Sequence, residues 1–99
     1  MKKWVPDYSN MSSTNLISGN QMTVTISDTG FICVGLITYG NNDECSLSIN
    51  GNKMMSGTAG TSGYGQASGV LPITSGDVIT LDYDTDVPHF MHFIPGKWV

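Results

Sequence analysis

Gly69-Val70-Leu71-Pro72-Ile73-Thr74-Ser75-Gly76-Asp77-Val78-Ile79-Thr80-Leu81 is the stretch that decides the fold class. Apolar and polar residues alternate on both sides of a Ser-Gly-Asp turn, which is typical of two half-buried strands. Gly76 suits the positive φ that a tight hairpin turn requires. We therefore expect a hairpin here. We expect the last strand, from Phe90, to end at Pro95-Gly96, because proline cannot donate to the ladder.

Strand patterns fill the rest of the chain, and no segment shows the 3.6-residue period of a helix. Gln21–Ser27 alternates polar and apolar residues, and Cys45–Ile49 does so again before Asn50-Gly51, a strong type I′ hairpin signal. Phe31–Tyr39 is a continuous apolar run, typical of a strand covered on both faces, and this favours a neighbouring subunit as the second cover. The sequence predicts an all-β, antiparallel, jelly-roll-like β-sandwich of seven or eight short strands.

The length of 99 residues predicts one domain over residues 1–99, with a weakly patterned N-terminal segment over residues 1–20. Met1-Lys2-Lys3 is not followed by the apolar stretch of a signal peptide, and no apolar run is long enough to insert into a membrane. We expect synthesis in a bacterial cytoplasm without a signal peptide.

Charge is scarce in this chain. Four lysines stand against eight acidic residues, which gives a net charge of −4. Four basic residues cannot follow a phosphate backbone, which argues against binding nucleic acid or an anionic membrane. Only 12% of the residues are charged, and small neutral polar residues take their place. Such a composition is common in extracellular and viral β-proteins, and in subunits whose surface is covered by neighbours.

No set of residues predicts catalysis, a metal or a cofactor. The carboxylates of Asp82, Asp84 and Asp86 do not match a calcium loop, since the required Gly and Glu positions are taken by other residues. A solvated loop is therefore the favoured interpretation. His89 and His92 are three residues apart, which puts them on opposite faces of a strand. We expect no catalytic residues, and therefore no enzyme.

The two cysteines are predicted to be free, buried thiols. If Phe31–Tyr39 and Cys45–Asn50 form a hairpin with Tyr39 opposite Cys45, Cys33 lies about 20 Å from Cys45 along the strand. A disulfide needs Cα atoms within about 7 Å.

Loops are the predicted contact regions, because binding residues concentrate on loops of a rigid sandwich. Gly57–Gly65 holds four glycines in nine residues and is expected to be a mobile surface loop. The other two predicted contact loops are Gly40–Glu44 and Thr85–His89. Aromatic rings beside neutral amides suit sugar hydroxyls. The ligand-contact candidates from these regions are Tyr39, Asn42, Tyr64 and His89.

Four motifs in order carry a resemblance to a family: Gly-Phe-Ile-Cys-Val at 30–34, Ser-Leu-Ser-Ile-Asn-Gly at 46–51, Val-Leu-Pro-Ile-Thr-Ser-Gly-Asp-Val-Ile-Thr-Leu at 70–81, and Phe-Ile-Pro at 93–95. Over about residues 20–96 the chain resembles small phage and prophage tail-fibre or tail-tip domains, which are similar to C1q and tumour-necrosis-factor jelly rolls. The resemblance implies a homotrimer in a virion that contacts a host surface glycan, a host protein or a partner fibre protein. This family has no fixed set of binding residues to carry over.

A second function stays open at this point. The chain could be a free carbohydrate-binding or adhesin-like module of bacterial origin. Oligomeric state separates the two, because sandwich carbohydrate modules are often monomeric whereas fibre heads form trimers.

Overall fold

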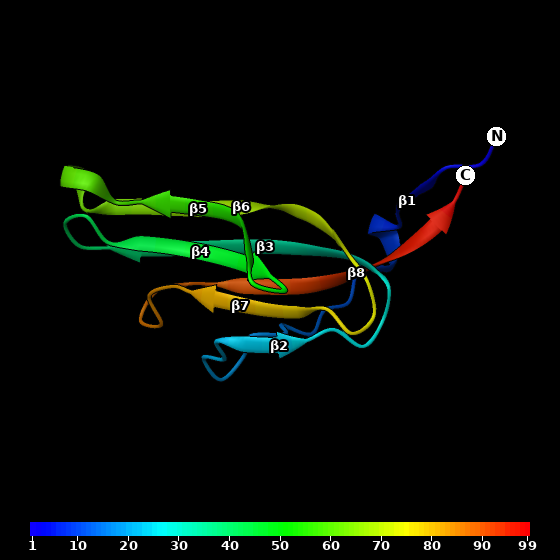
Figure 1. The fold of residues 1–99 in the computed structure, drawn as a ribbon, viewed down its shortest axis with the longest axis horizontal. Coiled ribbons are helices and arrows are strands. Elements are labelled where there is room, and N and C mark those ends of the chain that lie inside the picture. Colours follow the sequence, from blue (N-terminus) through cyan, green and yellow to red (C-terminus); the bar gives the residue numbers. More distant parts are fainter.

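The computed structural model describes residues 1–99 and shows two four-stranded antiparallel sheets packed as a sandwich (Figure 1). The strands are β1 (Trp4–Pro6), β2 (Thr23–Thr25), β3 (Gly30–Tyr39), β4 (Glu44–Ile49), β5 (Asn52–Thr58), β6 (Tyr64–Ile73), β7 (Val78–Asp82) and β8 (Phe90–Trp98). Two single 3₁₀ turns, η1 (Tyr8–Asn10) and η2 (Gly60–Ser62), complete the elements. The all-β prediction with seven or eight strands is confirmed.

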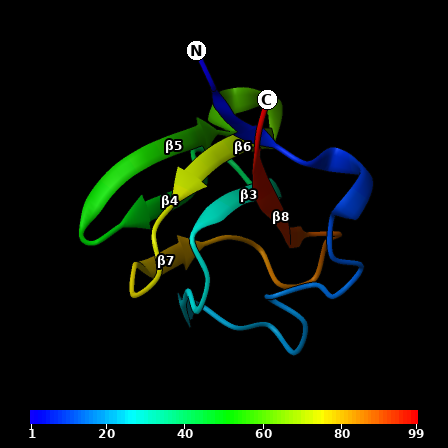
Figure 2. The same ribbon diagram turned by 90° about the vertical axis from the view of Figure 1, so that its right-hand side faces the viewer.

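The strand order is that of a jelly roll. One sheet runs β1-β8-β3-β6 and the other runs β2-β7-β4-β5. Only β4 and β5 are neighbours both in the sequence and in a sheet. This arrangement of eight strands in two sheets is the predicted fold. Figure 2 shows the first and last segments side by side at one end of the molecule, where the backbones of Lys3 and Val99 exchange two hydrogen bonds.

The core lies between the two sheets and is built by alternation along each strand. In β3, Ile32, Val34 and Leu36 are fully buried, and the residues between them face outward. Leu47 of β4 and Ile79 of β7 meet them from the opposite sheet, and all of them belong to one apolar cluster. The cluster holds the two sheets as a rigid frame for the loops at either end.

The hairpin predicted at Asn50-Gly51 is present. It joins β4 to β5, and its two residues have φ values of 50° and 84°, as a type I′ turn needs. The amide of Asn50 also donates to Asp77 and accepts from the N–H of Val78, which fixes the hairpin against β7.

The turn predicted around Gly76 is present, but the hairpin is wrong. Gly76 has φ 93°, and yet β6 and β7 lie in different sheets. The N–H of Gly76 donates to the carbonyl of Ile26, and that of Ser75 donates to the hydroxyl of Thr29. These bonds to the β2–β3 connection turn the chain from one sheet into the other.

The predicted pairing of Phe31–Tyr39 with Cys45–Asn50 is also wrong. Strand β3 pairs with β6 and β8, whereas β4 lies in the other sheet and pairs with β5 and β7. The two cysteines are nonetheless free, as predicted. Cys45 is fully buried, but Cys33 faces outward and is only half-buried. Alternation within β3, rather than the assumed hairpin, decides their environments.

Strand β8 continues through Pro95-Gly96, so the predicted end of the strand is wrong. Residues 90–95 pair with β3, and residues 96–98 pair with β1. Pro95 therefore lies where the strand changes partner, and its carbonyl accepts a hydrogen bond from the N–H of Asp7. A missing N–H costs least at such a change of partner.

The segment Gly57–Gly65 is more regular than predicted. Gly57 belongs to β5 and Gly65 belongs to β6, so only residues 59–63 connect the strands. A Cβ at Gly57 would overlap the backbone of Gln66, and one at Gly65 would crowd the backbone of Ala59. These two glycines permit the close approach of β5 and β6 where the sheets meet.

Candidate functional site

Three of the four candidate contact residues come together at one end of the sandwich. Tyr39 and Tyr64 are register partners on β3 and β6, and their ring centroids lie 5.6 Å apart. Asn42 follows in the β3–β4 loop, where its N–H donates to the carbonyl of Gly60 at 2.8 Å. The loop is thus tied to the turn after β5. The exposed fractions of Tyr39 and Tyr64 are 47% and 45%.

His89, the fourth candidate, has different neighbours. It lies in the connection between β7 and β8, and its ring packs 4.5 Å from that of Tyr83. Its Nδ1 is 2.8 Å from the carbonyl oxygen of Val87, and its own carbonyl accepts from the amide of Asn15. These contacts give His89 a role in holding the connection in place.

The sequence predicted a second cover for Phe31–Tyr39, but it did not identify the other residues on the outward surface of the β1-β8-β3-β6 sheet. Phe31, Cys33, Ile37 and Tyr39 of β3 point outward, because each alternates with a buried residue. Their register partners on the flanking strands share this face. We call the uncovered part of this surface the aromatic face: Cys33, Gly35, Ile37, Tyr39, Tyr64, Gln66, Ser68, Val70, Phe90 and His92.

Aromatic contacts run along this side of the sheet. The ring of Phe90 covers Gly35, where a Cβ would meet it, and lies 5.7 Å from the ring of His92. Farther along, Trp4 stacks with Phe31 at 6.4 Å and contacts Trp98 at 5.3 Å. None of the charged side chains lies on the aromatic face. The signal for it was the apolar character of every residue from Phe31 to Ile37, including those that point outward.

The opposite outer surface, on β2-β7-β4-β5, is mainly polar. Its outward residues include Thr23, Thr25, Glu44, Ser46, Ser48, Lys53, Thr80 and Asp82. Lys53 donates to Glu44 at 2.6 Å. This hydrogen bond raises the pKa of Lys53. The two outer surfaces therefore differ in their chemistry, and the polar one is suited to water.

A cleft opens between the β3–β4 loop and the end of β7. It has a volume of about 500 Å³ and is lined by Thr38, Asn42, Asp43, Glu44, Asp82, Tyr83 and Asp84. We call it the acidic cleft. Tyr83 is fixed in its wall, since its hydroxyl donates to the carbonyl of Gln21 at 2.8 Å, and burial raises the pKa of its phenol.

No group of three or more His, Cys, Asp or Glu side chains is arranged to hold a metal ion. The structure contains no helix with the length and apolar character needed to cross a membrane.

Comparison with family models, with curated proteins and with solved structures finds no match to this chain. The resemblance to phage tail domains and to C1q-like trimers therefore stays a prediction.

Proposed function

We propose that this chain is a non-enzymatic structural module of a phage or prophage virion, of the tail-fibre or tail-tip type, that forms a homotrimer through its aromatic face. The observation that carries the proposal is the contrast between the two outer surfaces. One is polar and suited to solvent, and the other is uncharged and rich in aromatic side chains. Jelly rolls are also frequent among viral structural proteins.

The size of the aromatic face is compatible with self-association. β3 and β6 are ten residues long and β8 pairs with β3 over Phe90–Pro95, so at about 4.8 Å between strands and about 3.3 Å per residue this face covers roughly 400 Å². Packed against equal areas of its neighbours in a trimer, this face would bury about 800 Å² in total, the size of a weak interface. A second copy of the chain is the favoured partner for this face, because its own aromatic face is also uncharged. Neither surface then requires a partner of opposite charge. The number three comes from the family resemblance alone.

Light scattering in solution tests this proposal. The wild-type chain should have the mass of a trimer. Val70→Glu places a charge on the aromatic face, where the Val70 side chain is 41% exposed, and should release monomers. Thr80→Glu is the matched control, because Thr80 lies on the polar surface of the other sheet, and this variant should stay trimeric. A wild-type monomer at micromolar concentration would overturn the trimer.

The location of the protein is tested separately. An antibody raised against the chain should label purified tail particles, at the fibre or the tip. If the protein is absent from intact particles but present in the cell as a soluble trimer, the assignment to the virion is contradicted, whereas the proposed trimer stands.

A second function, binding of a carbohydrate by a free module, is favoured by the Tyr39–Tyr64 pair. Two exposed rings, with the Tyr64 hydroxyl bonded to the amide of Gln66, offer flat apolar surface and hydrogen-bonding groups to a sugar. Tyr64→Ala should weaken binding on a glycan array with little change in the thermal midpoint. Tyr8→Ala, an exposed tyrosine beside β8 at the opposite end, is the control. A large drop in midpoint for Tyr64→Ala would show that Tyr64 is a packing residue.

A further inference from the structure

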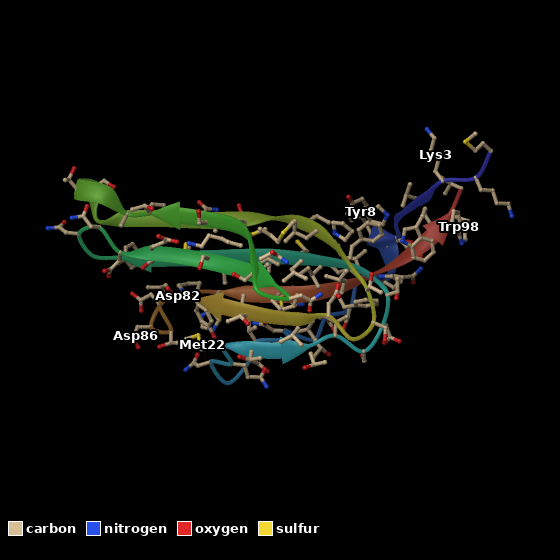
Figure 3. The ribbon with its side chains drawn as sticks, viewed as in Figure 1. Lys3, Tyr8, Met22, Asp82, Asp86 and Trp98 are labelled. Carbon is tan, nitrogen blue, oxygen red and sulfur yellow. The ribbon has the colours of Figure 1, made fainter.

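The acidic cleft lies in the half of the molecule that carries all of its net charge. Residues 40–44 and 82–86 contribute five carboxylates there, and Lys53 contacts one of them. Of the six other charged side chains, three are lysines and three are aspartates, so their charges cancel. The net charge of −4 therefore belongs to this half. Figure 3 shows Asp82 and Asp86 in one half of the long axis and Lys3 at the end of the other half.

Thr38 gives an independent sign that the cleft holds a ligand. It points inward from β3, is only 4% exposed and lines the cleft. Its hydroxyl makes no hydrogen bond within the protein, whereas every fully enclosed side-chain polar atom has a partner. The hydroxyl must therefore open onto the cleft. Buried polar groups are rarely left without a partner, so a group in the cleft is expected to bond to it.

The dimensions of the cleft favour an organic cation over a metal ion. A calcium ion needs six to eight oxygen atoms at about 2.3–2.6 Å. No three acidic side chains converge in that way. A volume of about 500 Å³ instead falls among the pockets that hold small organic molecules. An ammonium group has three donors and no acceptor, which matches carboxylates and a lone hydroxyl.

We propose that the acidic cleft binds an alkylammonium group. Asp84, whose N–H donates to the carbonyl of Ile37 next to Thr38, balances its charge, and Asp82 adds negative charge from the outer rim of the cleft. The Thr38 hydroxyl accepts one of its N–H donors, and the Tyr83 ring forms a wall for its alkyl chain. The group could belong to a free diamine or to a lysine side chain. Within this chain Lys2 and Lys3 offer such a side chain, because both are exposed and Lys3 lies at the opposite end of the long axis. Their insertion would join copies end to end, which is a contact different from the aromatic face.

Isothermal titration calorimetry with 1,5-diaminopentane at low ionic strength tests the site. Asp84→Asn should weaken binding about tenfold, as expected for the loss of a charge-assisted contact. Asp28→Asn is the matched control, since it makes the same change of charge in the β2–β3 connection away from the cleft, and it should bind as the wild type does. Thr38→Val should also weaken binding while preserving the fold by circular dichroism.

Two outcomes would overturn the proposal. One is equal weakening by Asp84→Asn and Asp28→Asn, which would indicate non-specific attraction. The other is equal binding of uncharged 1,5-pentanediol. The source of the group is decided by sedimentation at low salt of a Lys2→Gln, Lys3→Gln double variant. Loss of end-to-end association supports a lysine of a second copy. Unchanged sedimentation, with the diamine still bound in calorimetry, supports a free amine.

Discussion

Asn15 is expected to be among the most important polar side chains for stability. Its Oδ1 accepts hydrogen bonds from the N–H groups of Ile17 and Met91 at 3.1 and 3.0 Å, and its Nδ2 donates to the carbonyl of His89 at 3.2 Å. These bonds attach the N-terminal segment, including the fully buried Ile17, to the start of β8. Asn15→Ala removes all three at once.

The expected loss follows from these three bonds. A hydrogen bond contributes about 1 kcal/mol net, and more where its loss leaves a buried donor unsatisfied. Asn15 is half-buried, so water can replace part of what is lost. Asn15→Ala should therefore lower the free energy of unfolding by about 2–3 kcal/mol. For a domain of this size the midpoint should fall by roughly 10–20 °C.

Thermal and urea unfolding followed by circular dichroism would measure this loss. Asn15→Asp keeps the acceptor for both N–H groups and loses only the donor to His89, so it should lose less than half as much stability. Asn41→Ala removes an exposed amide in the β3–β4 loop and is the control. The reasoning would be refuted by a loss under about 0.5 kcal/mol for Asn15→Ala, a value typical of surface substitutions. Equal losses for the two Asn15 variants would refute it as well.

Three further predictions follow from the cysteines, an acidic turn and a close strand crossing. Thiol titration of the denatured, unreduced chain should find two free groups, and in the native state Cys33 should react before Cys45, because burial raises the pKa of Cys45; equal native rates would contradict this. The N–H of Thr74 and the side-chain amide of Asn50 donate to the carboxylate of Asp77 and lower its pKa below 3.8, the value expected in the unfolded chain. The contribution of Asp77 to stability is therefore complete above pH 3.8 and is lost as the pH falls through the lower pKa of the folded protein. The stability difference between wild type and Asp77→Asn should then shrink in acid, and a constant difference would argue against the shift. Gly57→Ala should lower the free energy of unfolding by about 1–3 kcal/mol in urea, because the added methyl group would overlap the backbone of Gln66, which cannot rotate away. Gly51→Ala is the control: its methyl group meets no atom, so its loss of stability measures the cost of the positive φ alone.

The sequence was sufficient to predict the strands and one hairpin, because alternation and the Asn50-Gly51 turn are local signals. It was insufficient for the pairing of Phe31–Tyr39 and for the path after Gly76. A tight turn can join two strands of one sheet or lead from one sheet to the other, and the choice here depends on hydrogen bonds to the distant Thr29 and Ile26. Distant partners of this kind leave no trace in a short window of residues.

The candidate site was predicted in part for the same reason. Tyr39 and Tyr64 were selected individually, and the structure makes them register partners. The acidic cleft joins residues of β3, the β3–β4 loop and the end of β7, which meet only through the sandwich. Thr38 was inconspicuous in the sequence, because its unpartnered hydroxyl is a property of its surroundings and not of its neighbours in the chain.

The strand order has a consequence for the speed of folding. Gly30 pairs with Pro95, and Thr23 pairs with Thr80, so most ladders join segments separated by tens of residues. Closing such large loops must precede the contacts that stabilise them, and chains of this kind fold in milliseconds to seconds rather than microseconds. Only the β4–β5 hairpin can form early from adjacent residues. During refolding β8 would pair late, because its partners in β3 and β1 lie more than 50 residues away in the chain. Until it pairs, the uncharged strand β3 keeps one edge open and is prone to aggregate through that edge.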